Sequence, residues 1–327
     1  MFPARRMRRY RRRIVQELFT ETCLHVSDLV APLFVDEGID RPLTIESMPG
    51  QSRLPVGDLP SSAERIRGLG LGAVLLFGIP SGKDPEASGA FASDGVIQRS
   101  VRAMKEAAPD LVVCTDVCAC EYTDHGHCGI VGDKPGGKDL LNDPSLELMN
   151  RIAVSHAEAG ADVVAPSCML DGMVRSIRGA LDDAGFEDVL IMSYSSKFAS
   201  GFYGPFREAA ESGYSFGDRT TYQLNPSNAR EALLESALDA DEGADILMVK
   251  PAGYYLDILS ALREFGLPLA AFQVSGEYAM IRAAAERGWI DERSAVMESL
   301  TCVKRAGADL VITYFAEQAA GWANEEP

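Results

Sequence analysis

Short apolar runs alternate with amphipathic stretches along the whole chain. The runs are rich in Val, Ile and Leu and are bounded by Gly, Pro or polar residues, which is typical of strands buried on both faces of a parallel sheet. We expect eight strands, at residues 29–35, 73–79, 111–117, 162–166, 189–194, 245–249, 268–274 and 309–314.

Segments with helical periodicity lie between these strands, at 61–69, 95–107, 145–159, 172–184, 228–241, 254–265 and 277–287. A Gly-Ala-Asp triplet recurs at 160–162, 243–245 and 307–309, each time between a helical pattern and a strand. Glycine there supplies the left-handed cap of the helix. Eight alternating strands and helices predict a (β/α)8 TIM barrel rather than an open α/β sheet.

One long irregular stretch, residues 198–222, follows the fifth expected strand and is rich in Gly, Ser, aromatic residues and Arg. A loop of this length in a compact domain is usually a lid or a binding loop, and an ordinary surface excursion is the alternative. We therefore divide the chain into an extended N-terminal arm at 1–16 and a single catalytic barrel at 17–327, with an active-site lid around 198–222.

Composition narrows the choice of function. The 327 residues are 46% hydrophobic and contain no apolar run of the ~18–20 residues that a membrane span needs, so we expect no membrane partner. Seven of the 31 basic residues are arginines within the first thirteen positions, which leaves 24 basic against 48 acidic residues in the body. A body this acidic repels phosphate backbones, so nucleic acid is not expected as the main partner.

The basic arm has three interpretations: it binds nucleic acid or anionic lipid, it is a transit peptide, or it docks on an acidic neighbouring subunit. The acidic body favours docking. The arm lacks the apolar core of a secretory signal, and the seven cysteines form no even-numbered disulfide framework, so we expect a reducing, cytoplasmic location.

The active site of a TIM barrel lies at the C-terminal ends of its strands. The polar residues that follow the expected strands are Asp116, Ser167, Lys197, Lys250, Ser275 and Tyr314.

Two lysines give the sharpest chemical signal, because only seven occur in the chain and Lys197 and Lys250 end consecutive strands. Desolvation and a neighbouring ammonium group both lower the pKa of a lysine, and only the neutral amine attacks a carbonyl. Two such residues predict Schiff-base chemistry on two carbonyl substrates. The alternative is that each lysine caps its strand and pairs with a local carboxylate.

Three cysteines lie within eleven residues, at Cys118, Cys120 and Cys128. Zinc favours thiolate ligands, and three protein ligands plus water describe an open, catalytic site. His125 and His127 are close in sequence to this cluster, and the role of Cys168 stays open at this stage.

Several residues are candidates for binding the carboxylate groups of substrates. Arg207 and Arg219 lie in the expected lid, where guanidinium groups would clamp a substrate carboxylate, or would be ordinary surface charges. Ser275 and Tyr314 offer hydroxyls for a second carboxylate, or satisfy backbone groups. Glu235 belongs to an acidic helix face, and nothing in that pattern alone indicates metal binding.

Eight longer sequence motifs resemble those of a known protein family. They are SMPGQSR (47–53), DVCACEYTDHGHCG (116–129), APSCMLDG (165–172), SYSSKFASGFYGPFREA (193–209), GDRTTYQL (217–224), ADILMVKPAG (244–253), QVSGEYAM (273–280) and RAGADLVITYF (305–315). In this order they closely resemble the porphobilinogen synthase family, also called 5-aminolevulinate dehydratases, from about residue 17 to 323.

The resemblance implies a hydro-lyase that condenses two molecules of 5-aminolevulinate to porphobilinogen, with loss of water, in tetrapyrrole (heme) synthesis. It implies that Lys250 forms a Schiff base with the substrate that contributes the propionate side, that Lys197 holds the other molecule, and that Asp116 assists proton transfer. The carboxylate of the Lys197-bound molecule is assigned to Arg207, Arg219 and Gln223, and that of the Lys250-bound one to Ser275 and Tyr314.

The resemblance also implies metals and an assembly. Cys118, Cys120 and Cys128 match the zinc-dependent class, and Glu235 matches the position of an allosteric magnesium ligand. The family is typically a homo-octamer in which the arm embraces a neighbour. Two departures stand out: Cys168 replaces an Asp of some relatives, and Phe272 replaces a frequent Tyr.

Two rival functions remain at this stage. A class I aldolase is another Schiff-base barrel, but it needs one imine-forming lysine and no thiolate metal. A zinc-containing binding protein whose basic arm grips nucleic acid or membrane predicts salt-dependent binding and no turnover.

Overall fold

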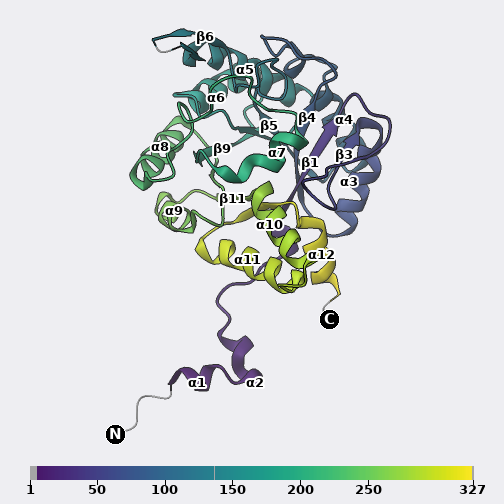
Figure 1. Ribbon diagram of the computed structural model, residues 1–327, viewed down its shortest axis with the longest axis vertical. Helices are drawn as coiled ribbons and strands as arrows, with labels where there is room; N and C mark the ends of the chain where they lie inside the picture. Colours follow the sequence, from purple (N-terminus) through teal and green to yellow (C-terminus); the bar gives the residue numbers. More distant parts are fainter. Residues whose placement is uncertain (1–5, 136, 326–327) are drawn as a thin grey trace.

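The computed structural model describes residues 6–135 and 137–325. Within that part of the chain, eight parallel strands form a closed barrel in which each strand pairs with the next and the last pairs with the first. All eight expected strands are present, so the predicted TIM barrel is confirmed (Figure 1). The strands are β1 (Leu29–Asp36), β4 (Ala73–Ile79), β5 (Val112–Val117), β8 (Val163–Pro166), β9 (Leu190–Lys197), β10 (Ile246–Lys250), β11 (Leu269–Gln273) and β12 (Leu310–Thr313).

Helices surround the barrel and cover its outer face (Figure 1). Their apolar stripes pack inward: α4, for example, buries Ile97, Val101 and Met104. The helices are α3 (Leu59–Gly68), α4 (Val96–Ala107), α5 (Asn142–Glu158), α6 (Met173–Asp183), α8 (Ala229–Glu242), α9 (Leu256–Leu262), α10 (Ser275–Glu286), α11 (Glu292–Ala306) and α12 (Ala316–Asn324).

Several elements differ from the sequence-based expectation. The sequence analysis does not predict helices α11 and α12. The helix expected at 254–265 is α9 followed by a 3-10 turn at Arg263–Phe265. Two short strand pairs were also missed, because their residues are mostly polar and lie outside the barrel. They are β2 (Leu43–Thr44) with β3 (Ser52–Pro55), and β6 (Val131–Lys134) with β7 (Gly137–Leu140).

The expected helix caps are confirmed. Gly160 and Gly243, which precede β8 and β10, have φ values of 102° and 106°, in the region that favours glycine. At Gly243 the amide donates to the carbonyl of Ala240, so the cap closes α8 before the chain turns back to the barrel.

Strand β9 contains an irregularity that shapes the site. Ser193 pairs with Leu247 and Ser196 with Val249, so β9 has one more residue than β10 over the same length. An extra residue of this kind re-aims the side chains that follow it. Tyr194 and Lys197, three positions apart, therefore both face the barrel interior.

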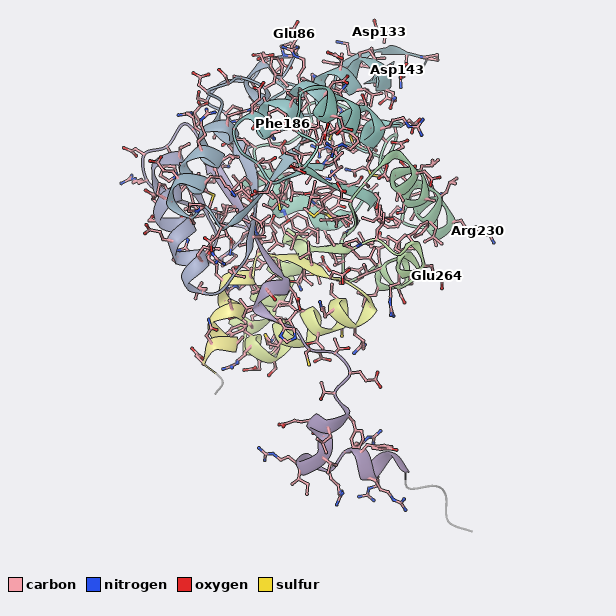
Figure 2. The ribbon with its side chains drawn as sticks, turned by 180° about the vertical axis from the view of Figure 1, so that it is seen from behind. Glu86, Asp133, Asp143, Phe186, Arg230 and Glu264 are labelled. Carbon is pink, nitrogen blue, oxygen red and sulfur yellow. The ribbon has the colours of Figure 1, made fainter. Side chains whose placement is uncertain are left out.

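The lid and the arm lie in different parts of the molecule: the lid lies over the barrel, and the arm lies away from it (Figure 1). The lid contains a 3-10 turn at Gly201–Tyr203 and helix α7 (Gly204–Ala209), and α7 lies over the centre of the strand ring (Figure 1). The arm, with α1 (Arg6–Tyr10) and α2 (Arg13–Gln16), extends away from the barrel, and a 3-10 turn at Glu17–Phe19 follows it (Figure 2). Residues 1–5 of the expected arm, including Arg5, lie outside the described residues.

No helix in the described residues combines the length and the hydrophobicity needed to cross a lipid bilayer.

Candidate active site

The two strand-end lysines lie next to each other. Lys197 of β9 and Lys250 of β10 are direct partners in the parallel register. Their side chains are both buried, with 6% and 5% of the residue surface exposed. They share one cavity, whose other lining residues are Phe77, Asp116, Cys120, Glu121, Ser167, Tyr203, Phe206, Arg207, Arg219 and Gln223.

Lys250 lies among aromatic rings. Its Nζ is 4.0 Å from the ring centroid of Phe272, and four more rings lie within 5.0–5.9 Å, those of Tyr194, Phe206, Tyr203 and Phe77. Burial is the main reason that the pKa of Lys250 falls to about 7, and the Lys197 ammonium lowers it further. The expectation of a lowered pKa is confirmed for this lysine.

Lys197 has polar neighbours. Its Nζ donates a hydrogen bond to the Ser167 carbonyl. Burial lowers the pKa of Lys197, but the Cys128 and Cys118 sulfurs and the Asp116 carboxylate outweigh burial, so that the pKa lies above its ordinary value. The expectation of a lowered pKa is therefore wrong for this lysine in the metal-free protein, because the sequence did not show how close the sulfurs come.

Asp116, near the end of β5, interacts electrostatically with the amines of both Lys197 and Lys250. Burial raises the pKa of its carboxyl group, and the ammonium groups of Lys197 and Lys250 oppose that rise. Ser167 Oγ donates to Asp116 Oδ2 over 3.3 Å. A buried carboxyl group beside two amines is a candidate for general acid–base catalysis.

The three cysteines of the motif converge. The Sγ atoms of Cys118, Cys120 and Cys128 lie within 4.8 Å of one another, and all three side chains are buried. Hydrogen bonds from Cys118, Cys120 and Cys168 hold the pKa of Cys128 well below its ordinary value. A buried set of three cysteine sulfurs this close together fits a soft divalent metal ion such as zinc.

Neither histidine of the motif joins this sulfur cluster. The ring of His127 contacts Phe216 O at 3.0 Å and the Tyr222 hydroxyl at 3.1 Å through its two nitrogens. His125 Nδ1 accepts a hydrogen bond from the His127 amide. Cys168 contacts Met149 Sδ at 3.3 Å and Val117 O at 3.6 Å, so its thiol lies beside the cluster.

Three donors around the cavity have no hydrogen-bond partner among the residues that the structure describes: Arg207 Nε, Arg219 Nε and Gln223 Nε2. Leaving a buried donor unpaired costs about 1–3 kcal/mol, so a set of three unpaired donors at one cavity indicates a site for an acceptor such as a carboxylate. All three come from the lid or the residue directly after it.

Ser275 and Tyr314 are not among the residues that line the lysine cavity. The Tyr314 ring is stacked on Phe34 with centroids 5.8 Å apart, and its hydroxyl is buried without a partner. The Ser275 hydroxyl accepts from the Phe206 amide at 3.0 Å and contacts the Phe202 carbonyl at 3.4 Å. Its observed bonds thus go to the lid backbone.

Glu235 lies elsewhere. It is on α8 and lines a separate cavity together with Asp171 and Glu231. Burial, and then the charges of Asp171, Glu242 and Glu231, raise the pKa of Glu235 to about 6. This acidic group is therefore not part of the lysine cavity.

Among the residues that the sequence analysis did not predict, Glu121 and Phe206 line the cavity, and the Tyr194 ring lies near the amines of both lysines. Glu121 is buried beside Cys120 Sγ at 3.2 Å, and burial raises its pKa to about 7. Phe206 covers Lys250 from the lid, and Tyr194 reaches both lysines only because of the extra residue in β9. Glu121 could have been found from its place inside the cysteine motif, whereas nothing in the sequence indicates the irregularity of β9.

The chain is similar to known proteins over nearly its whole length. The family model "Delta-aminolevulinic acid dehydratase" matches residues 4–322. A delta-aminolevulinic acid dehydratase of Methanothermobacter thermautotrophicus is 54% identical over 324 residues, 98% of each chain. One of Halalkalibacterium halodurans is 52% identical over 313 residues, 95% of this chain and 94% of the relative.

A solved structure agrees with these relatives. The delta-aminolevulinic acid dehydratase of Toxoplasma gondii, in complex with the reaction product porphobilinogen, superimposes with a TM-score of 0.96. Its sequence is 44% identical, and the match covers 100% of this chain and 93% of that one. These findings favour neither the aldolase nor the binding protein, and they confirm the resemblance: the chain belongs to the delta-aminolevulinic acid dehydratase family, the porphobilinogen synthases.

Proposed function

We propose that this hydro-lyase condenses two molecules of 5-aminolevulinate to porphobilinogen through Schiff bases at Lys250 and Lys197. The observation that carries the proposal is the pair of buried amines at neighbouring strand ends, in one cavity with three unpaired donors. With a pKa of about 7, about half of the Lys250 amines are neutral at pH 7 and can attack.

The imine step follows from this amine. The Lys250 nitrogen attacks the ketone carbon of 5-aminolevulinate, and the carbonyl oxygen becomes a hydroxyl group. That oxygen then leaves as water once it has been protonated, and a carbon–nitrogen double bond remains. Asp116 is the group we assign to move these protons, because its carboxyl lies near both amines and its pKa is raised.

The two substrates differ in their carboxylate partners. Arg207, Arg219 and Gln223 bind the carboxylate of the Lys197-bound molecule in this proposal, since their free donors face the cavity. Ser275 and Tyr314 serve the Lys250-bound molecule, which contributes the propionate side. Holding both substrates in one cavity under a lid removes much of the entropic barrier of a reaction between two molecules.

Cys118, Cys120 and Cys128 would hold zinc, as their buried sulfur atoms fit that ion. Bound there, zinc would supply Lewis-acid polarisation of a substrate oxygen or amine. The chain's own contribution is to keep the three sulfurs together beside Lys197, whose pKa responds to their charge.

The activity itself is tested with purified protein and 5-aminolevulinate, in paired samples with and without a zinc chelator. We expect porphobilinogen to form, to stop forming with the chelator and to return with added zinc. Absence of product at every salt and magnesium concentration would contradict the proposal. Product that is indifferent to chelation would keep the function and reject the catalytic metal.

We also propose an assembly, a homo-octamer in which the arm docks on a neighbouring subunit. The arm exposes 85% of Ile14 alongside its arginines, and Leu18 just after the arm is 76% exposed, which suits an apolar and acidic partner surface. Deleting residues 1–16 should lower the mass measured by light scattering. An unchanged mass would reject arm docking.

Glu235 is proposed as an allosteric magnesium ligand, since it lies with other carboxylates away from the lysine cavity. Magnesium should then raise the activity of the unmodified enzyme but not that of Glu235→Gln. Equal activation of both would reject this site. The seven cysteines are all free, which supports our proposal of a cytoplasmic location.

A further inference from the structure

The second half of the lid, residues 210–222, lies directly on the loop that carries the cysteines. Ser215 donates its amide to the His125 carbonyl over 3.0 Å, and its hydroxyl contacts the same oxygen at 3.3 Å. Arg219 Nη2 donates to the Gly126 carbonyl at 3.0 Å and to the Ser212 carbonyl at 2.9 Å. The guanidinium that we assign to substrate binding is thus held by the cysteine loop itself.

His127 adds a second attachment between the two segments. Its ring lies 4.3 Å from that of Phe216, and its two nitrogens contact Phe216 O and the Tyr222 hydroxyl. The next residue in the chain is Cys128. Any shift of Cys128 is therefore passed to the lid through one peptide bond and two hydrogen bonds.

Gly126 allows the two backbones to meet. Its φ is +72°, and a Cβ atom there would collide with the carbonyl oxygen of Gly213 in the lid. The lid has another glycine with positive φ, Gly217 at +57°, around which no atom lies within 4 Å of the Cβ position. Alanine would strain both backbones, but only at Gly126 would it also push the segments apart.

The first half of the lid is held differently. The Phe206 amide donates to Ser275 Oγ, and Arg53 Nη2 donates to the Glu208 carbonyl at 2.7 Å. These contacts involve the barrel and not the cysteine loop. Backbone hydrogen bonds from Ala210 to Phe206 and from Ser212 to Arg207 join the two halves, so a change in the cysteine loop should act most strongly on the residues beyond 212.

We propose that Gly126 and His127 are positioning residues that fasten residues 210–222 to the cysteine loop, so that a metal ion on the three sulfurs orders this part of the lid and places Arg219. The proposal rests on the function proposed above for Arg219. Cys118, Cys120 and Cys128 would hold the metal together, and their loop would then be more restricted. Without the metal the loop gains freedom, and the segment attached to it opens more often.

Hydrogen exchange tests this without relying on turnover. In the full-length protein, the Ser215 amide should exchange about tenfold faster after metal removal, the size expected when one or two hydrogen bonds are lost. Amides of 204–209 should change much less, and zinc should restore the original rate. An unchanged Ser215 rate in the stripped protein would overturn the proposal.

Substitutions at two glycines distinguish the effect of the Gly126 contact on the lid from the effect of the metal. Zinc-loaded Gly126→Ala should keep one zinc per chain, expose Ser215 to fast exchange and raise KM for 5-aminolevulinate about tenfold with a smaller change in kcat. Gly217→Ala should do none of this. Protection of Ser215 in zinc-loaded Gly126→Ala equal to that of the unmodified protein would reject the role of Gly126. If Gly126→Ala loses zinc, the proposal is decided by the exchange rate of the Ser215 amide in the metal-stripped, unmodified protein.

Arg219→Lys distinguishes failure of this inference from failure of the proposed function. A raised KM in Arg219→Lys together with a metal-independent lid would keep Arg219 as a substrate ligand and reject the coupling. An unchanged KM would reject the assigned role of Arg219, while the exchange rates would still decide whether the metal orders the lid.

Discussion

Lys250 and Lys197 end neighbouring strands and pair in register, yet their surroundings shift their pKa values in opposite directions. Around Lys250 lie five aromatic rings, which offer little to replace the water that an ammonium group loses on burial. Around Lys197 lie two sulfurs, a carboxylate and a backbone carbonyl, all of which stabilise positive charge. Burial alone therefore does not make a reactive lysine.

Because of this difference, the two amines become nucleophilic under different conditions. Lys250 is ready to act as a nucleophile near neutral pH in the metal-free protein. Lys197 stays charged until the negative charge on the sulfurs is offset. A divalent cation bound by those sulfurs would do this, because a positive ion nearby lowers the pKa of an ammonium group.

Removing either amine should have the largest effect. Lys250→Ala and Lys197→Ala should each lower kcat/KM by about 10⁴-fold or more, as expected when a covalent catalytic group is lost. Reduction with borohydride in the presence of 5-aminolevulinate should leave no adduct at the substituted position, as checked by mass spectrometry. Normal turnover by either variant would contradict the catalytic role assigned to the substituted lysine.

Stability should respond to the two lysines with opposite sign. Lys250→Met should stabilise the protein by a few kcal/mol near pH 7, because one pKa unit corresponds to about 1.4 kcal/mol and this amine is fully buried. The pKa of Lys250 is lower in the folded than in the unfolded chain, so the gain is largest below pH 7 and disappears as pH rises toward 10.5.

Lys197→Met should instead destabilise by about 1 kcal/mol or more, since the Ser167 carbonyl loses its donor. Urea unfolding of the metal-free variants between pH 6 and 10 measures both effects. The same sign for both would show that the environments are not different in the way described.

Zinc should act on one lysine and not on the other. Loading the metal-free protein should increase the adduct trapped at Lys197 at pH 8 by about tenfold, the effect of a pKa lowered by one unit. The adduct at Lys250, which lies among rings, should change little. Equal gains at both sites would indicate that zinc acts on substrate binding rather than on the Lys197 amine.

Asp116 should give the smallest effect on the amines. Its carboxylate raises the pKa of Lys250, so Asp116→Asn should let the Lys250 adduct form at a lower pH, by about half a unit to one unit. Turnover should fall in the same variant because proton transfer is lost. A shift of the adduct profile to higher pH would contradict this direction.

Much of this could be predicted from the sequence, and the reasons are local. Apolar runs that end in Lys197 and Lys250 indicate both the strands and the barrel mouth, and the spacing of Cys118, Cys120 and Cys128 predicts a metal site. These signals need no knowledge of distant contacts.

The contrast between the lysines could not be predicted. The rings around Lys250 come from β4, β9, β11 and two parts of the lid, and only the closed fold brings them together. The irregularity of β9, which aims Tyr194 inward, depends on its pairing with β10. The attachment of His127 to the lid is likewise a tertiary contact, which its place beside Cys128 in the sequence does not indicate.

The most direct test of the account is the pH dependence of trapping at each lysine in the metal-free protein. Samples with 5-aminolevulinate are reduced with borohydride across pH 5.5–9.5, and the adducts are quantified by peptide mass spectrometry. The account predicts a Lys250 adduct with a midpoint near pH 7 and a Lys197 adduct that needs a clearly higher pH. Coincident midpoints, or trapping of Lys197 at the lower pH, would contradict it.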